Sequence, residues 1–351
     1  ASMQETSADM PDRWLWLPIK EGNVKAGSLW GLFESTDETA PLMAPATLDS
    51  WLAAAEGDTS GFWFLSFLAD VAFPEAFVWG EYAATGISDA EFADAYYAAG
   101  GDPGSILETE ATDFSWAGGG LSSAWPASPD YAPYQGVQPS DVETLLVGGT
   151  LDFSTPPRFA TAGVLPSLTD GEQVILEGFA HSEDFWTYQP EANEQLLTTF
   201  FDTGQVDDSA YVPQVVDFEV GGPTHAAMAK VLLGVLIGVA LLAVLLVAWM
   251  ALRVRSRGRF GPNGSAVLRS LAPVLLGLGG WFTAVLIVMP VWPATPLDST
   301  LVAVLSIGSA IGAGLYLAWI DRRREARVRY MGLAAALMGA LVGAWIGFSA
   351  V

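Results

Sequence analysis

Four long apolar stretches constrain this chain more than any other feature of its sequence. They cover residues 231–252, 271–289, 301–320 and 331–351, and none of them contains a charged residue. Each approaches the ~20 residues that a helix needs to cross the hydrocarbon core of a bilayer. We therefore predict an all-α transmembrane domain of four helices in residues 231–351, with the lipid bilayer as its partner.

The arginines between these stretches predict the orientation of the domain. Residues 253–259 contain four arginines and residues 321–329 contain five, whereas residues 290–300 contain no basic residue. Loops rich in Lys and Arg remain on the cytoplasmic side of a membrane. We therefore expect both Arg-rich loops to be cytoplasmic, and residues 1–225 and the C-terminus to lie on the extracytoplasmic side.

Glycines recur at four-residue spacing within the apolar stretches: Gly234/Gly238, Gly308/Gly312 and Gly339/Gly343/Gly347. Faces of small residues let helices approach each other closely in lipid. Our first interpretation is packing within the four-helix set, and the alternative is docking to other subunits of a membrane complex. No ionisable residue lies in the middle of a stretch, which argues against a transporter, a proton relay or a channel.

The two parts of the chain carry opposite charge. Residues 1–225 contain four basic and 36 acidic residues, and residues 226–351 contain 11 basic and three acidic residues. The outer part lacks the clustered Lys and Arg that hold a phosphate backbone, so we predict no nucleic-acid partner. The chain has no Cys, which excludes a disulfide framework, a Cys–zinc site and a thiol nucleophile. We predict no cofactor and no metal site.

A pattern typical of α/β proteins follows a helical segment and an irregular one. Residues 40–100 predict short helices, and residues 100–139 are rich in Gly, Pro and Ser and predict irregular structure. The next elements are a strand at 143–148, a helix at 155–165, a strand at 173–177 and a helix at 191–201. The continuous apolar runs are typical of parallel strands buried on both faces. This order predicts a parallel βαβα unit.

Two polar residues follow the two predicted strands. Asp152 lies in the loop 149–154 and His181 in the loop 178–182. Because both loops leave the carboxyl ends of adjacent strands, we expect a carboxylate and an imidazole at the same edge of the sheet. Such a pair holds the ring in one tautomer and stabilises its protonated form. The alternative is that Asp152 caps the next helix and His181 is a polar loop residue.

The residues around these loops resemble a known family. The runs 144–157 (TLLVGGTLDFSTPP) and 174–182 (VILEGFAHS), with Ala124, Trp125 and Pro126, are similar to the C-terminal lobe of α/β-hydrolases. The resemblance is to the exported tripeptidyl-aminopeptidase-like and proline-iminopeptidase-like enzymes of high-GC bacteria. It covers residues 124–201 and is loose over residues 10–123, which would be the helical lid. It implies Asp152 as the orienting acid and His181 as the general base of a serine hydrolase, in a bacterial plasma membrane.

The chain departs from this family at the nucleophile. It contains no Gly-x-Ser-x-Gly motif, and the nearest sequence, residues 57–61 (GDTSG), predicts a turn and a helix cap. Two buried parallel strands alone cannot satisfy their backbone hydrogen-bonding groups. The chain also begins at Ala1 without an export signal. We therefore expect the serine and the first strands to lie upstream, in the same precursor or in a separate chain.

These observations predict four regions with distinct roles: a lid-like segment (1–123), an α/β-hydrolase C-terminal lobe (124–212), a juxtamembrane linker (213–230) and a membrane domain (231–351). The function expected is that of the C-terminal part of a membrane-anchored extracytoplasmic serine hydrolase of the peptidase or esterase type. The alternative is a non-catalytic accessory subunit of a membrane complex. His225 is interpreted as a surface residue beside the membrane, and residues 62–68 as core or as the lining of an apolar pocket.

Overall fold

The computed structural model of the chain describes residues 2–35, 42–102, 104–125, 128–134, 136–295, 299–319 and 326–349. The chain forms two compact units: Ala1–Asp12 with Ile19–Met228, and Arg13–Pro18 with Ala229–Val351. Helices make up most of the described chain, and strands are few.

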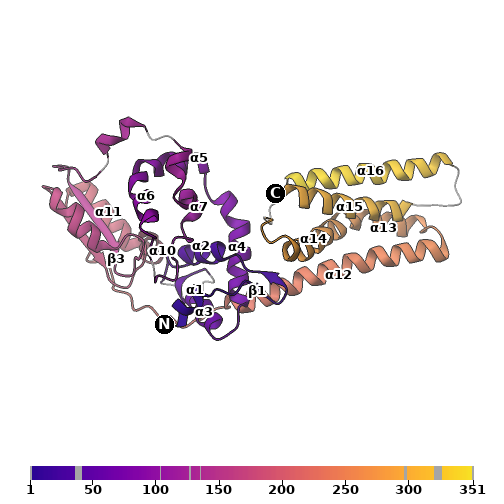
Figure 1. Ribbon diagram of the computed structural model, residues 1–351, viewed down its shortest axis with the longest axis horizontal. Coiled ribbons are helices and arrows are strands. Elements are labelled where there is room, and N and C mark those ends of the chain that lie inside the picture. The colour runs from indigo at the N-terminus through magenta and orange to yellow at the C-terminus, as the bar shows by residue number, and fades with distance from the viewer. Residues whose placement is uncertain are drawn as a thin grey trace. The chain divides into compact units, whose positions relative to one another are not determined.

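Helices dominate the N-terminal half of the first unit (Figure 1). They are α1 (Ser2–Ala8), α2 (Glu21–Gly31), α3 (Ala44–Ala55), α4 (Ser60–Ala76), α5 (Trp79–Gly86) and α6 (Ala90–Ala98), with a 3₁₀ turn at Ile87–Asp89. The aromatic run at 62–68 lies in α4, which packs against α2 and α3. Trp51, Phe62, Trp63 and Leu65 are at most 2% exposed, so α4 provides the core of this region.

Short helices replace the irregular structure expected for residues 100–139. They are α7 (Asp113–Trp116), α8 (Leu121–Ala124) and two 3₁₀ segments, Ala117–Gly119 and Pro129–Tyr134. Pro126, part of the segment that carried the family resemblance, lies outside the described residues.

The βαβα unit forms as expected. Strand β3 (Thr144–Gly149) pairs in parallel with β4 (Gly171–Leu176), from Thr144 opposite Gly171 to Gly149 opposite Leu176. The connection is one helical segment made of α9 (Pro157–Phe159), a π turn (Ala160–Val164) and a 3₁₀ turn (Leu165–Ser167). Helices α10 (Ser182–Tyr188) and α11 (Pro190–Thr203) follow β4. The sequence analysis predicted α11 but missed α10.

One face of β4 provides the core of this sheet region. Its side chains alternate, with Val174 and Leu176 buried and Ile175 exposed. The buried face packs with Phe179, with Phe185 of α10 and with Leu196 of α11. Phe179 belongs to the loop after β4, so this core includes part of that loop.

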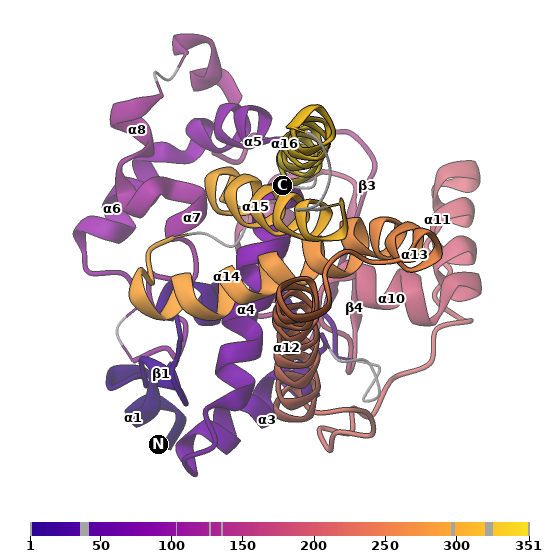
Figure 2. The ribbon, with the colours of Figure 1, turned by 90° about the vertical axis from the view of Figure 1, so that its right-hand side faces the viewer.

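The second unit contains the apolar stretches. Its elements are the hairpin of β1 (Arg13–Trp14) and β2 (Leu17–Pro18), the part of α12 (His225–Arg257) from Ala229 onward, α13 (Pro262–Leu271), a π turn (Ala272–Leu276), α14 (Gly277–Val291), α15 (Thr300–Trp319) and α16 (Ala326–Ser349). Figure 2 views α12 and α16 end-on, whereas α14 lies across the view. The second Arg-rich loop begins with residues 321–325, which lie outside the described residues.

The expected four spans are only partly supported. Two described helices, α12 and α15, are long and apolar enough to cross a membrane. Two further pairs of helices are bent, and the number of candidate spans rises to at most four if each pair is one span. One of these pairs is Pro262–Leu271 and Val274–Val288, which meet at 45°. In α16, the described apolar part is the shorter Ala336–Trp345. The chain therefore has two to four candidate membrane helices, and the count of four is not confirmed.

The glycine faces of α15 and α16 pack against each other. A Cβ atom added at Gly308 would lie 2.9 Å from the carbonyl oxygen of Ala340, and one at Gly343 would lie 3.2 Å from Cα of Gly308. An added Cβ at Gly234 or Gly238 of α12 meets no atom within 4 Å. Packing within the helix set therefore explains the glycines of α15 and α16. At Gly234 and Gly238, the face of α12 has no close neighbour among the described residues. The side chain of residue 347 lies outside the described part.

His225 is not a surface residue, and that expectation was wrong. It is 0% exposed, its Nδ1 lies 2.8 Å from the hydroxyl oxygen of Ser50, and its ring stacks on Phe64 with the centroids 5.3 Å apart. The long-range contact with α3 explains the error, because sequence position alone placed His225 beside the membrane. It belongs to the core of the first unit.

Candidate active site

Asp152 lies in the loop after β3 and is bound by its own neighbours. Its side chain is 3% exposed. Oδ1 accepts hydrogen bonds from the N–H and the hydroxyl of Ser154, both at 3.0 Å, and from the N–H of Thr155 at 2.9 Å. Oδ2 accepts from the Thr155 hydroxyl at 2.7 Å. Asp, Ser and Thr at this spacing favour such a turn. The bonds organise the loop that precedes α9, and the partners of the Asp152 carboxylate are Ser154, Thr155 and His181 rather than residues of α9.

The hydrogen bonds determine the charge of Asp152. Burial acts to raise the pKa of its carboxyl group, because an ion is less stable away from water. The N–H and hydroxyl of Thr155, together with His181 and Ser154, bind the ionised form and lower the pKa below its ordinary value. Asp152 is therefore a carboxylate at neutral pH.

His181 lies in the loop after β4 and contacts this carboxylate. Its Nδ1 is 2.8 Å from Oδ2 of Asp152, and its side chain is 32% exposed. The hydroxyls of Ser154 and Thr155 lie 3.4 Å from the same Nδ1. In the neutral ring, the tautomer with its proton on Nδ1 donates to this carboxylate and leaves Nε2 as an acceptor. Within the described ranges, no residue hydrogen-bonds Nε2. The pair expected from the two strand ends is thus present.

A second buried carboxylate fixes the histidine loop. Asp184, in the first turn of α10, is 0% exposed. Its Oδ2 accepts from the N–H of Ala180 at 2.9 Å and from the hydroxyl of Ser35 at 3.1 Å, and Oδ1 accepts from the N–H of Ser35 at 3.4 Å. The N–H of His181 donates to the carbonyl of Phe33 at 2.9 Å. The segment after α2 therefore binds the backbone of His181 directly, and binds Ala180 indirectly through the Asp184 carboxylate.

The sequence analysis did not find Asp184, Ser35 or Phe33. One signal was available: an acidic residue in the first helical turn often bonds an N–H just before the helix. That signal went unused because α10 was not predicted. Phe33 and Ser35 reach the site across about 150 positions of the chain, and no local pattern indicates such a contact.

The two loops can approach because β3 ends in glycine. A Cβ atom added at Gly149 would lie 2.1 Å from the carbonyl oxygen of Phe179 and 2.2 Å from that of Ala180. Any side chain at this position would separate β3 from the histidine loop. Gly149 therefore permits the contact between Asp152 and His181.

Three hydroxyls are candidate nucleophiles, Ser154 and Thr155 because they lie close to His181 and Ser60 because of its sequence. None of the three lies where it could give its proton to Nε2 of His181. Ser154 and Thr155 approach Nδ1, on the side of the ring that faces Asp152. Ser60, from the GDTSG sequence, is 0% exposed, and its hydroxyl donates to Asp58 at 2.5 Å, just before α4. That segment is a turn leading into a helix, as the sequence predicted.

One acidic cluster in the described chain has the geometry of a cation site. Carboxylate oxygens of Glu21, Glu108 and Glu110 lie within 4.8 Å of one another. The ammonium group of Lys25 already binds all three, at 2.7, 2.7 and 3.3 Å, and the Lys25 side chain is 0% exposed. The cluster neutralises a buried lysine and joins α2 to the segment before α7.

In α/β-hydrolases, the acid and the base of the catalytic triad lie on loops that follow parallel strands, and the Asp152–His181 pair has the same kind of placement. The comparison with known families agrees, since residues 113–212 match the family model Abhydrolase_4, described as TAP-like protein. The matched segment includes Asp152 and His181. It supports an α/β-hydrolase family for this part of the chain and suggests a hydrolase-type function. No curated protein and no solved structure matches the chain.

Proposed function

We propose that the chain is the C-terminal part of a membrane-anchored extracytoplasmic serine hydrolase, with Asp152 and His181 as its acid and base. The carrying observation is the 2.8 Å contact between Oδ2 of Asp152 and Nδ1 of His181, with Nε2 facing no described partner. This arrangement leaves a basic nitrogen available to a hydroxyl nucleophile. The chain lacks the Gly-x-Ser-x-Gly sequence, so the serine is supplied from outside these 351 residues.

The geometry supports a two-step acyl transfer. Nε2 of His181 takes the proton of the serine hydroxyl as its oxygen bonds to the carbonyl carbon of a peptide or ester. Asp152 stabilises the imidazolium through Nδ1. His181 then gives the proton to the departing amine or alcohol, and water hydrolyses the acyl-enzyme by the same route. A further strand could bring the serine to this edge, because β3 pairs with β4 alone among the described strands.

Labelling by a fluorophosphonate, which reacts only with an activated serine, tests the proposal. We expect a membrane preparation containing this chain and the protein encoded upstream to label the upstream part. Changing His181→Gln in this chain should abolish that labelling. A matched control is Gln195→Ala, which removes a surface hydrogen bond to Asp207 and leaves the two loops intact. Labelling that persists in His181→Gln at the wild-type rate would remove His181 from the mechanism.

One observation favours a second candidate, an accessory subunit of a larger membrane complex. The face of α12 around Gly234 and Gly238 has open space within 4 Å, and small-residue faces are used for helix association in lipid. Purification in a mild detergent separates the two functions. Co-migration with a stable assembly that Gly234→Leu disrupts, together with absent labelling, would favour the subunit.

A further inference from the structure

A tight hairpin near the N-terminus exposes two large apolar side chains. Strand β1 pairs antiparallel with β2, with Arg13 opposite Pro18 and Trp14 opposite Leu17. The turn between the strands therefore consists of Leu15 and Trp16, whose exposed fractions are 63% and 43%. Two-residue hairpin turns usually contain Gly, Asn or Asp. Adjacent leucine and tryptophan are an unusual pair for such a turn in water.

The backbone of the turn makes the leucine more unusual still. The φ angle of Leu15 is +56°, a left-handed conformation that favours glycine because a Cβ atom crowds the neighbouring carbonyl. In the described part of the chain, Leu15 shares a positive φ with two other residues that are not glycine, Glu108 and Ala117. Strained residues of this kind occur where the side chain has a use. The turn thus keeps an apolar side chain where its backbone favours none, which points to a partner for that side chain.

The hairpin belongs to the second unit, together with the apolar helices. Strand β2 packs against α14. Figure 2 shows the hairpin next to the end of α14 that leads into the loop before α15. Two residues at that end are also exposed and apolar, Val291 at 58% and Trp292 at 62%. Exposed apolar and aromatic side chains from two distant segments therefore lie at the same end of the helix set.

The composition of the hairpin suits the boundary between lipid headgroups and acyl chains. Tryptophan is enriched at this level of a bilayer, because its ring is apolar and its N–H is a donor. The one charged residue of the hairpin is Arg13, and an arginine can lay its apolar stem in lipid while its guanidinium stays with the headgroups. The hairpin contains no acidic residue, although residues 1–225 contain 36. It therefore lacks the carboxylates that would oppose contact with lipid.

We propose that the tip of this hairpin inserts into the bilayer beside the end of α14, with Leu15 among the first carbons of the acyl chains and Trp16 among the headgroups. The proposed orientation of the chain puts residues 1–225 and the loop after α14 on the extracytoplasmic side, so the hairpin enters the outer leaflet. The inference rests on the membrane anchorage in the proposed function. It does not depend on the hydrolytic chemistry.

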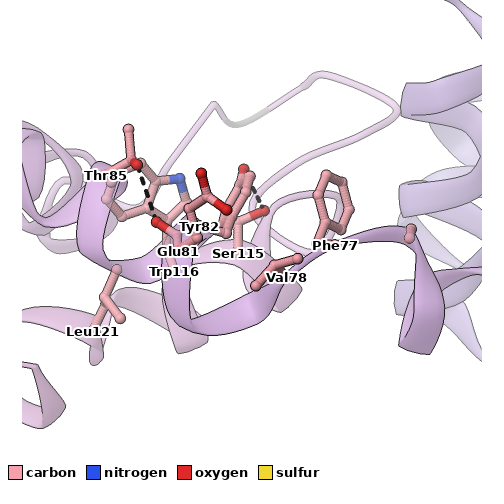
Figure 3. A pocket seen from close by; sticks show the side chains of 10 residues that line it. Phe77, Val78, Glu81, Tyr82, Thr85, Ser115, Trp116 and Leu121 are labelled. Carbon is pink, nitrogen blue, oxygen red and sulfur yellow. Dashed lines mark hydrogen bonds between the residues drawn. The ribbon is translucent and has the colours of Figure 1, made fainter.

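The first unit provides a comparison, an exposed aliphatic residue that also precedes a tryptophan. Val78 is 72% exposed, and the ring of the next residue, Trp79, lies 5.2 Å from that of Phe77. Val78 lines a cavity of about 480 Å³ together with Phe77 and Glu81 (Figure 3). The carboxylate of Glu81 would be costly in lipid. We therefore expect Val78 to face water, although it is as exposed and apolar as Leu15.

Spin labelling of the full chain in phosphatidylcholine nanodiscs tests the proposal. Because the chain has no Cys, each single substitution places one nitroxide label: Leu15→Cys in the hairpin, Val78→Cys as the water reference and Leu245→Cys as the lipid reference. Leu245 lies in α12 and is 62% exposed, which matches Leu15. Paramagnetic resonance compares the access of oxygen, which concentrates in hydrocarbon, with that of a water-soluble nickel chelate. We expect oxygen to reach the labels at Leu15 and Leu245 more readily than nickel does, and the reverse at Val78.

Two substitutions at Trp16 test its role in the labelled Leu15→Cys chain. Trp16→Glu puts a carboxylate at the tip, where contact with lipid is costly, so the access of the label should shift from oxygen towards nickel. Trp16→Phe keeps an aromatic ring and should leave the label accessible mainly to oxygen. Circular dichroism and melting temperature check that each variant is folded.

The outcomes separate this inference from the proposed function. A label at Leu15 that nickel reaches more readily than oxygen, while Leu245 shows the reverse, would overturn the inference alone. A label at Leu245 that lies in water would overturn the membrane anchorage itself. If Trp16→Glu causes no shift, Trp16 does not lie at the boundary. If the label at Val78 behaves like that at Leu15, the charge argument is wrong. Persistent fluorophosphonate labelling in His181→Gln would overturn the hydrolytic mechanism and leave the hairpin unaffected.

Discussion

The buried carboxylate of Asp152 predicts a particular dependence of stability on pH. Its pKa is raised by burial but lowered further by Thr155, His181 and Ser154, and the net direction is downward. In the unfolded chain the pKa returns to about 3.9. A group with a lower pKa in the folded state stabilises the fold above its unfolded pKa, and that contribution disappears as the pH falls through the folded pKa.

We therefore expect Asp152→Asn to reduce the free energy of unfolding most at neutral pH and least in acid. The difference from the wild type should shrink as the pH falls below about 4. Denaturant titrations followed by tryptophan fluorescence measure it. Asp207→Asn is the comparison, because the pKa of Asp207 is also lowered, by Ser209 and Gln195, but in a more exposed turn that contains no histidine. A difference that does not change with pH would contradict this account of Asp152.

Asp184 is a positioning residue for His181, and its loss should affect turnover more than stability alone explains. Asp184→Asn replaces one acceptor oxygen by an NH₂ donor. This donor then faces the N–H of Ala180 or the N–H and hydroxyl of Ser35, which are donors to the carboxylate in the wild type. We expect the free energy of unfolding to fall by about 1–3 kcal/mol. We also expect kcat to fall about 10–100-fold, with KM little changed. The NMR signal of the Nδ1 proton of His181 should weaken or shift. An unchanged signal and an unchanged kcat would leave Asp184 with a structural role only.

At the scale of elements, the approach of β3 to the histidine loop is the most sensitive point. Gly149→Ala places a methyl group against two carbonyl oxygens that cannot move independently of β4. We expect a loss of stability of about 2–3 kcal/mol and loss of fluorophosphonate labelling. Gly148→Ala is the matched control, since its Cβ would meet Pro157 at 3.3 Å, and it should be tolerated better. Similar effects of the two substitutions would contradict the close-approach argument.

The sequence predicted those elements whose pattern is local. The apolar runs of β3 and β4 and the prolines before α9 were sufficient to place the parallel unit and the loops of Asp152 and His181. The helix α10 was missed because it is short and directly precedes α11. The second apolar stretch was predicted to begin at residue 271, and the sequence analysis did not predict the helix Pro262–Leu271, which meets Val274–Val288 at a 45° bend. Pro273, which has no N–H to donate within a helix, lies at this bend.

At the scale of the molecule, composition predicted two parts suited to different solvents. The acidic first part is suited to water, and the second part has two to four helices long and apolar enough to cross a membrane. Composition could not predict the contacts between segments that lie far apart in the sequence. His225 illustrates this point, since its burial depends on Ser50 and Phe64, which are more than 160 residues away. The same holds for the cavity of about 510 Å³ in the first unit, whose wall comes largely from α2, α3 and α4.

The absence of cysteine makes the orientation of the membrane helices directly testable. We propose that residues 1–225 and the loop after α14 lie outside, with the Arg-rich end of α12 in the cytoplasm. Single substitutions Thr203→Cys, Ala294→Cys and Ser256→Cys place one thiol at an exposed position in each of these regions. A maleimide that does not cross membranes should label the first two in intact spheroplasts, and should label Ser256→Cys only after permeabilisation. Labelling of Ser256→Cys in intact spheroplasts would reverse the orientation. If Thr203→Cys is labelled and Ala294→Cys is not, the bent segment of α13 and α14 returns to the side on which it entered, and the number of spans falls below four.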